Sequence, residues 1–195
     1  MKRKPIIEGN LYYCHHISEE DKEDVLRFTV ETRKGPGIAL QDYIRNIAIP
    51  SEREGLTRTY LVRSKKGPEE IVGYFSLQCG LVSVDEKGLF HRSFDSIPGV
   101  EMSNFAINSS YIQKHPQERG VGHVIFTNFV LPVVDKASET VGISILYIFA
   151  LPAKTLIDRY RAYGFSRLNW KQERSLHRRI KPRYDQGCIF MYIAL

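Results

Sequence analysis

The sequence predicts an α+β (α/β) fold, in which a mixed, mostly antiparallel central sheet is flanked by helices. Segments of strand-like composition predominate, and segments of helical periodicity stand between some of them. Residues 143–151 and 187–195 are nearly all apolar, which is typical of strands buried on both faces. Because the 195 residues contain no linker or low-complexity break, we expect a single domain over residues 1–195.

The strand predictions rest on runs of β-branched, aromatic and other apolar residues. The predicted strands are residues 11–17, 57–63, 70–84, 100–112, 143–151 and 187–195. Lys-Lys-Gly-Pro-Glu at 65–69 separates the second strand from the third and is typical of a hairpin turn.

The helix predictions rest on helical spacing of apolar residues together with start and stop signals. The predicted helices are residues 19–30, 38–48, 122–131 and 153–164, with a loop at 33–37 between the first two. Ser18 is the expected N-cap of the first helix, with Asp21 in its acidic first turn. Pro132 should kink or end the third helix, and Gly164 should cap the end of the fourth.

Composition narrows the function classes. No apolar run reaches the roughly 18–20 residues that a membrane span needs. The three cysteines and six histidines show neither a disulfide framework nor a ligand spacing, so we expect a cytoplasmic protein without a metal site.

The net charge is +6, and residues 171–183 carry most of it, with six Lys or Arg against one Glu. Such a local basic segment indicates an anionic partner.

The segment Gln117-Glu118-Arg119-Gly120-Val121-Gly122 precedes an apolar run and marks the start of a helix. Glycines at a helix start let backbone N–H groups approach an anion, such as a pyrophosphate. A phosphate loop of the Walker type is excluded, because His123 stands where Lys is needed, and Ile125 replaces the third glycine of a dinucleotide fingerprint. The segment fits the Gln/Arg-x-x-Gly-x-Gly pattern of an acetyl-CoA loop, and taken alone it equally fits an ordinary helix entry.

The order of the segments resembles the GCN5-related N-acetyltransferase superfamily. Residues 101–107 resemble the fourth strand of that family, and the glycine segment, the strand 143–151 and the Tyr-x-x-x-Gly-Phe motif at Tyr160–Phe165 follow in the family's order. The resemblance spans about Leu11 to Leu195. It implies an acyl-CoA acyltransferase fold and acetyl-CoA as co-substrate. The link between Ile107 and Gln117 is longer than is usual, so an extended strand or a bulge is expected there.

The resemblance also implies which residues would contact the cofactor. The backbone of Phe105, Ala106 and Ile107 would pair with the pantetheine arm, while the N–H groups of residues 118–123 would hold the pyrophosphate. The thioester would enter between the fourth and fifth strands of the family fold. The expected cofactor-binding residues are Phe105, Ala106, Ile107, Gln117, Glu118, Arg119, Gly120, Val121, Gly122, His123 and Leu156.

Two residues are candidates for the chemistry of acetyl transfer. By its place in the Tyr-x-x-x-Gly-Phe motif, Tyr160 would protonate the leaving thiolate, and core packing on its helix face is the alternative. Glu101 would act as the base, directly or through water, and a solvated or ion-paired strand residue is the alternative. We therefore expect an N-acetyltransferase that transfers acetyl to a primary amine by direct attack.

The acceptor stays open between three classes: a small molecule, a protein and an aminoacyl-tRNA. Residues 38–45, 55–62 and 71–77 resemble the acetyltransferase toxins of toxin–antitoxin pairs, which acetylate the α-amine of aminoacyl-tRNA. A basic flank suits RNA, and the residues that would contact it are Lys171, Arg174, Arg178, Arg179, Lys181 and Arg183. A solvated loop is the alternative for this flank, and a catalytically silent acyl-CoA-binding module is the alternative for the whole chain. No membrane partner is expected, and a homodimer is one assembly open to the chain.

Overall fold

The computed structural model describes residues 4–31, 36–66, 69–83, 96–179 and 187–195, with the backbone alone for Pro36 and Arg179. The chain divides into two compact units, which are described separately. Unit 1 comprises Met1–Gln78 with Ser103–Val133, and unit 2 comprises Cys79–Met102 with Val134–Leu195.

One eight-stranded mixed sheet contains the strands, in the order β1-β2-β3-β4-β5-β6-β8-β7. The strands are β1 (Ile7–Glu8), β2 (Tyr12–His16), β3 (Arg58–Ser64), β4 (Ile71–Ser83), β5 (Ser96–Ile107), β6 (Ile145–Ala150), β7 (Ser166–Arg167) and β8 (Ile189–Ala194). The pairs β1–β2, β2–β3, β3–β4, β6–β8 and β7–β8 are antiparallel, whereas β5 and β6 are parallel. The predicted mixed, mostly antiparallel sheet is confirmed.

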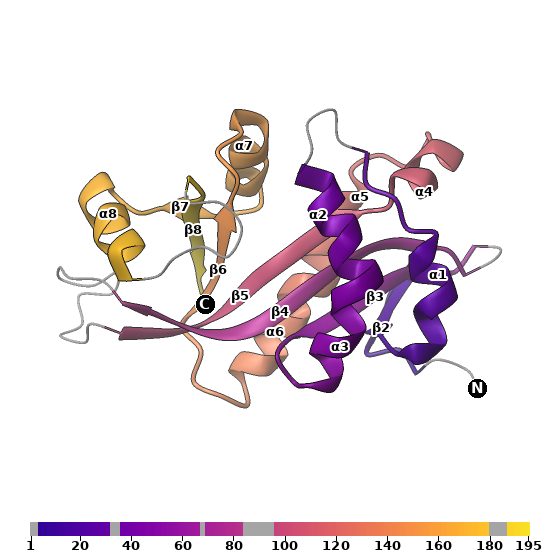
Figure 1. Cartoon of the computed structure of the whole chain (residues 1–195), viewed down its shortest axis with the longest axis horizontal. Helices are drawn as coiled ribbons and strands as arrows, with labels where there is room; N and C mark the ends of the chain where they lie inside the picture. The colour runs from indigo at the N-terminus through magenta and orange to yellow at the C-terminus, as the bar shows by residue number, and fades with distance from the viewer. Residues whose placement is uncertain (1–3, 32–35, 67–68, 84–95, 180–186) are drawn as a thin grey trace. The chain divides into compact units, whose positions relative to one another are not determined.

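The helices stand between the strands, as predicted, but they are more numerous than the sequence indicated (Figure 1). They are α1 (Lys22–Leu26), α2 (Pro36–Asp42), α3 (Ala48–Arg53), α4 (Ser109–Lys114), α5 (Val121–Ile125), α6 (Leu131–Ser138), α7 (Lys154–Ala162) and α8 (Trp170–Arg179). A 3-10 turn at Glu19–Asp21 precedes α1, and π-helical turns at Tyr43–Ile47 and Phe126–Val130 join α2 to α3 and α5 to α6.

Several predicted ends of elements are confirmed at the level of individual hydrogen bonds. The first helical segment begins at Ser18, which forms a reciprocal capping box with Asp21, but the helix ends at Leu26, earlier than expected. Gly164 follows α7 with a positive φ of 97°, as expected of a glycine that ends a helix. The hairpin turn predicted at 65–69 falls partly outside the described residues, because Gly67 and Pro68 lie beyond them.

Pro132 does not end its helix, which was one of the two outcomes expected there. The helix continues through Pro132 to Ser138, because a π-helical turn precedes the proline and the N–H of Leu131 donates to the carbonyl of Phe126, five residues back. The same arrangement precedes Pro50, where the N–H of Ala48 donates to the carbonyl of Tyr43. A π turn shifts the hydrogen-bond pattern just where proline lacks an N–H, so both helices pass their prolines unbroken.

The strand predicted over residues 100–112 is wrong beyond Ile107. Asn108 ends β5 and caps α4, since its side-chain oxygen accepts from the N–H of Ser110 at 3.2 Å. Its side-chain amide donates to the carbonyl of Ile71 at 2.8 Å. The long link after the fourth family strand therefore contains a short helix, neither a longer strand nor a bulge.

Unit 1 packs helices on both faces of its strands. One face is covered by α1, α2 and α3 (Figure 1). Val25 of α1, Ala48 of α3 and Phe28, Tyr43 and Ile44 from the segments next to these helices form a core there with Leu61 and Tyr74. Gly73, the neighbour of Tyr74, faces the other side, where an added Cβ would lie 2.9 Å from the side chain of Ile125 in α5.

A buried ionic network accompanies the core of unit 1. The Arg63 guanidinium, 1% exposed, donates to Asp21 and to Asp24 at 2.8 Å each. Its Nε donates to His15 Nε2 at 3.0 Å, while His15 Nδ1 bonds the carbonyl of His16. Because arginine can only donate, His15 accepts through Nε2 and is the neutral tautomer with its proton on Nδ1.

Unit 2 has its own core around β6 and β8. Ile145 and Tyr147 of β6, Phe190 of β8 and Leu176 of α8 are buried together with Val82, Ile97 and Leu168. Within the residues that the structure describes, no helix has the length and apolar character that crossing a membrane requires.

Candidate active site

The glycine segment forms a left-handed turn that starts a helix. Gly120 has φ 69° and ψ 17°, a conformation that disfavours a side chain, and it is the N-cap of α5. The first bond of the helix joins the N–H of Val124 to the carbonyl of Gly120 at 3.0 Å. The N–H groups of Val121 and Gly122 precede that bond, so the helix provides no acceptor for them. Gln117, Arg119 and His123 are exposed beside this turn.

Glu118 anchors the turn to the body of unit 1. Its carboxylate accepts hydrogen bonds from the hydroxyls of Tyr12 and Tyr111, the latter at 2.8 Å, and from Lys66 at 3.4 Å. Burial raises the pKa of Glu118, but these three donors lower it further than burial raises it. The N–H of Glu118 donates to the carbonyl of His115 at 3.0 Å. The carboxylate and the N–H of Glu118 therefore both hold the glycine turn in place.

The end of β5 is held close to β4. An added Cβ at Gly73 would lie 2.8 Å from the carbonyl oxygen of Ala106, so only glycine allows this approach. Ala106 is buried, while Phe105 and Ile107 are half-buried. The segment predicted to carry the pantetheine arm is thus the end of a strand that lies close to β4.

In unit 2 the structure joins Glu101 to a residue that the sequence did not single out. Glu101 and Tyr147 are register partners in the parallel pairing of β5 with β6. Burial, and then the charge of Glu101 and a hydrogen bond to it, raise the pKa of the Tyr147 phenol. The phenol therefore stays protonated and donates to the Glu101 carboxylate. The Tyr147 hydroxyl also lies directly over Gly80, where a Cβ would come within 1.8 Å of it.

Tyr160 lies on α7 among aromatic side chains. Its ring packs edge-on against Tyr163 and Phe165, with centroid distances of 6.1 and 5.5 Å. Burial raises the pKa of the Tyr160 phenol, so the phenol is protonated at neutral pH. No hydrogen bond joins Tyr160 to Glu101 in the part of unit 2 that the structure describes. Leu156, one turn earlier on α7, is half-buried.

The basic segment begins as a helix rather than a loop. Lys171, Arg174 and Arg178 are exposed on α8, and Arg179 is the last residue of that helix. Lys181 and Arg183, which were also expected to contact RNA, lie outside the described residues.

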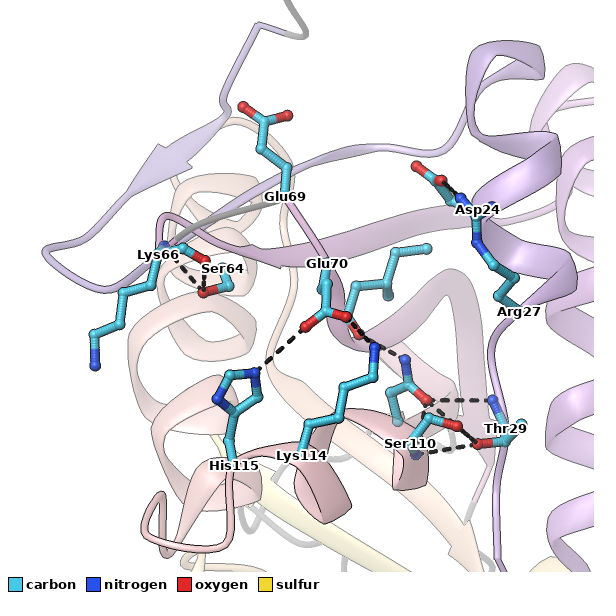
Figure 2. A network of polar contacts seen from close by, with 12 residues as sticks. Asp24, Arg27, Thr29, Ser64, Lys66, Glu69, Glu70, Ser110, Lys114 and His115 are labelled. Carbon is cyan, nitrogen blue, oxygen red and sulfur yellow. Dashed lines mark hydrogen bonds and ion pairs between the residues drawn. The ribbon is translucent and has the colours of Figure 1, made fainter.

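A cavity of about 480 Å³ in unit 1 was not predicted. It is lined from α1, the start of β4 and α4, by residues that include Asp24, Glu70, Tyr111 and Lys114. Two of the carboxylates that line it form ion pairs. Glu70 pairs with Lys114 and His115, and Asp24 pairs with Arg27 and Arg63 (Figure 2 shows the pairs of Glu70). Tyr111 connects the cavity wall to the glycine turn through its bond to Glu118. Segments distant in sequence build this cavity, and no local pattern reveals it.

In the described part of the chain, no group of three His, Cys, Asp or Glu side chains could hold a metal ion. The cysteines Cys14 and Cys188 are buried, Cys79 is exposed, and all three are free thiols.

No protein-family model matches the chain, and no curated protein matches it either. Solved structures do share its fold. A tyrosine-to-phenylalanine mutant of KacT aligns with a TM-score of 0.69 at 18% identity, over 95% of this chain and 95% of that chain. A tyrosine-to-phenylalanine mutant of the toxin AtaT, bound to the C-terminus of the antitoxin AtaR and acetyl-CoA, aligns with a TM-score of 0.65 at 18% identity, over 95% and 94%.

AtaT complexed with acetyl-methionyl-tRNAfMet aligns with a TM-score of 0.67 at 19% identity, over 94% of each chain. These structural neighbours are toxin acetyltransferases of the GCN5-related type. The chain therefore has the fold of the GCN5-related toxin acetyltransferases, as the order of its sequence segments predicted.

Proposed function

We propose that the chain is an acetyl-CoA-dependent N-acetyltransferase that transfers acetyl to a primary amine by direct attack. The observation that carries this proposal is the left-handed turn at Gly120, which starts α5 and follows β5 and the short helix α4 in the chain. The resemblance gives that place to the acetyl-CoA loop, and AtaT, which shares the fold, has been solved with acetyl-CoA.

The proposed cofactor contacts use the backbone more than side chains. The N–H groups of Val121 and Gly122 would donate to the pyrophosphate, aided by the positive end of the helix. Each such charge-assisted bond contributes roughly 1.5–3 kcal/mol. The exposed Arg119 supplies a cation beside them. Phe105, Ala106 and Ile107 would pair with the pantetheine arm. They form the end of β5, and the parallel pairing of β5 with β6 reaches only as far as Glu101.

The proposed chemistry requires a neutral amine, a stabilised tetrahedral oxyanion and a proton for the leaving thiolate. Glu101 would accept the amine proton, directly or through water, while Tyr147 holds its carboxylate in place. Tyr160 would donate to the sulfur as the carbon–sulfur bond breaks. Burial raises the pKa of this phenol, so the phenol is protonated at neutral pH and has a proton to donate.

The test is acetyl-CoA consumption with a panel of amines, read by free thiol release and by mass spectrometry of the acetylated product. Tyr160→Phe keeps the ring packing and removes the hydroxyl. It should lower kcat by roughly 10²–10⁴-fold, the usual contribution of a positioned acid, with acetyl-CoA affinity unchanged. Tyr163→Phe removes a hydroxyl from the neighbouring ring and is the matched control. Equal rates for the two variants would remove Tyr160 from the mechanism.

The second candidate acceptor is the α-amine of an aminoacyl-tRNA. The exposed Lys171, Arg174 and Arg178 on α8 favour it, because phosphate contacts supply much of the affinity for RNA. A complex of AtaT with acetyl-methionyl-tRNAfMet supports the same acceptor. Acetyl-CoA binding without transfer to any amine would instead favour the catalytically silent module.

A further inference from the structure

The start of α8 is stabilised by hydrogen bonds between residues that are close in sequence. Asn169 is its N-cap, and the Asn169 side chain accepts from the N–H of Gln172 at 3.0 Å. The Gln172 side chain accepts in return from the N–H of Asn169 at 3.3 Å. This reciprocal pair is a capping box, which stabilises a helix start without tertiary contacts. Lys171, Arg174 and Arg178 are therefore presented from a defined helical surface.

One face of α8 packs in the core of unit 2. Ser175 and Leu176 are buried, and Leu176 belongs to the hydrophobic cluster around β6 and β8. His177 packs edge-on against Phe149 at a centroid distance of 6.2 Å. Glu173, the acidic residue of the helix, pairs with Arg167 at 2.9 Å. The carboxylate of Glu173 is thus paired with a residue outside α8 and does not neutralise the cations of its exposed face.

The opposite face carries an aromatic and cationic stripe, defined here as Trp170, Lys171, Arg174 and Arg178. Residues four apart on a helix are neighbours, so Trp170, Arg174 and Arg178 form one row. Lys171 lies beside this row, with its Nζ 5.8 Å from the centroid of the Trp170 ring. Trp170 is 68% exposed, although it is the sole tryptophan of the chain. None of the three cations forms an ion pair within the described residues of unit 2.

The composition of the stripe selects among anionic partners. A bilayer surface would require an apolar face to enter the lipid, and the apolar face of α8 is already buried in unit 2. An acidic peptide would satisfy the cations but gives no reason for an exposed tryptophan beside them. A strand with unpaired bases satisfies both, since its phosphates meet the cations and a base stacks on an aromatic ring.

We propose that the stripe binds single-stranded nucleic acid, with a base stacked on Trp170 and phosphates at Lys171, Arg174 and Arg178. The proposal rests on the proposed function only in taking RNA as the source of the strand. The contacts themselves need no acetyl transfer, so binding and catalysis are separable.

The experiment uses Trp170 as its own reporter, because the protein has no other tryptophan. The full-length protein is titrated with a 15-nucleotide oligouridylate, and the fluorescence of Trp170 should be quenched. With three phosphate contacts the slope of log K against log salt is about −2.1, so affinity should fall about 18-fold between 50 and 200 mM salt. The deoxy oligomer, a duplex RNA, polyglutamate and phosphatidylserine vesicles are titrated in parallel.

Variants separate the two kinds of contact. Arg178→Gln should reduce the salt effect to about 7-fold, since two phosphate contacts remain. Trp170→Ala, followed with a fluorescently labelled oligomer, should weaken binding roughly 5- to 150-fold with the salt slope unchanged. Lys136→Gln removes an exposed lysine of α6, also in unit 2, and should change neither quantity. Thermal unfolding of each variant checks that the fold persists.

Each outcome decides the proposal. Quenching by the single strands alone, with the predicted slopes, supports it, and the comparison of ribo- and deoxyoligomers identifies the source of the strand. Stronger binding to vesicles, polyglutamate or duplex overturns it, as does a Trp170→Ala variant that binds like Lys136→Gln. Oligomer binding without acetyl transfer to any amine would defeat the proposed function alone, whereas transfer to small amines without oligomer binding would defeat this inference alone.

Discussion

Substituting Gly80 by alanine should disturb the candidate active site by displacing Tyr147. The new Cβ would stand 1.8 Å from the Tyr147 hydroxyl oxygen and 2.8 Å from the ring carbon that bears it. The ring has little room to move, because it is 3% exposed and packs against Phe149 and Phe190, with centroids 6.0 and 5.5 Å away. The hydroxyl must therefore leave Glu101.

The expected cost follows from three contributions. Overpacking a core costs about 1–3 kcal/mol, and a lost hydrogen bond to a charged group costs about 1.5–3 kcal/mol. Alanine is favoured over glycine within a strand by about 0.5–1 kcal/mol. The net loss in unfolding free energy for Gly80→Ala should therefore be about 2–5 kcal/mol.

The assay is urea unfolding, in which a lower midpoint at constant slope reports lost stability. Gly142→Ala is the matched control, because no atom lies within 4 Å of its added Cβ. Adding Tyr147→Phe to Gly80→Ala removes the closest contact, so the double variant should be more stable than the sum of the two single losses predicts. Equal midpoints for Gly80→Ala and Gly142→Ala, or strict additivity in the double variant, would refute the arrangement of Tyr147 over Gly80.

Three further perturbations test other parts of the structure. Gly120→Ala should lower the free energy of unfolding by roughly 1–2 kcal/mol, because Gly120 has a positive φ. It should also weaken acetyl-CoA binding, measured by calorimetry, more than Gly120→Asn does, and equal binding by the two variants would argue against a strained phosphate turn. Hydrogen bonds hold the pKa of Glu118 below its ordinary value despite burial. The wild-type protein should therefore be more stable than Glu118→Gln above about pH 4.3, and this advantage should be lost as the pH falls through the lowered pKa. A stability difference that does not depend on pH between 3 and 7 would contradict this. Arg63→Met should lose about 3–5 kcal/mol in urea unfolding, because Asp21 stays buried without its cation, and Asp21→Asn in the same protein should recover part of it.

Local signals predicted those elements that local interactions define. The capping box of Ser18 and Asp21, the glycine end of α7 and the all-apolar strands of unit 2 each need only neighbours in sequence. The capping box of Asn169 and Gln172 is an equally local signal for α8, although the charge of the segment alone does not indicate a helix.

Other features depend on contacts between distant segments and could not be predicted from patterns. In the sequence, Glu118 is only one residue of a glycine motif. In the structure, its carboxylate accepts a hydrogen bond from the phenol of Tyr12, 106 residues earlier. Tyr147 reads as one apolar position of a buried strand, and only the parallel register with β5 brings it to Glu101. In the same way, the turn at Asn108 depends on its bond to Ile71 in β4.

The central claim is that this chain moves acetyl from acetyl-CoA to an amine. The most direct measurement is mass spectrometry of the acceptor after incubation with the protein and acetyl-CoA, with small amines, peptides and aminoacyl-tRNA as separate acceptors. We predict an acetylated product in one of these classes, formed in step with free thiol and lost in Tyr160→Phe. Bound acetyl-CoA with no acetylated product from any class would contradict the claim.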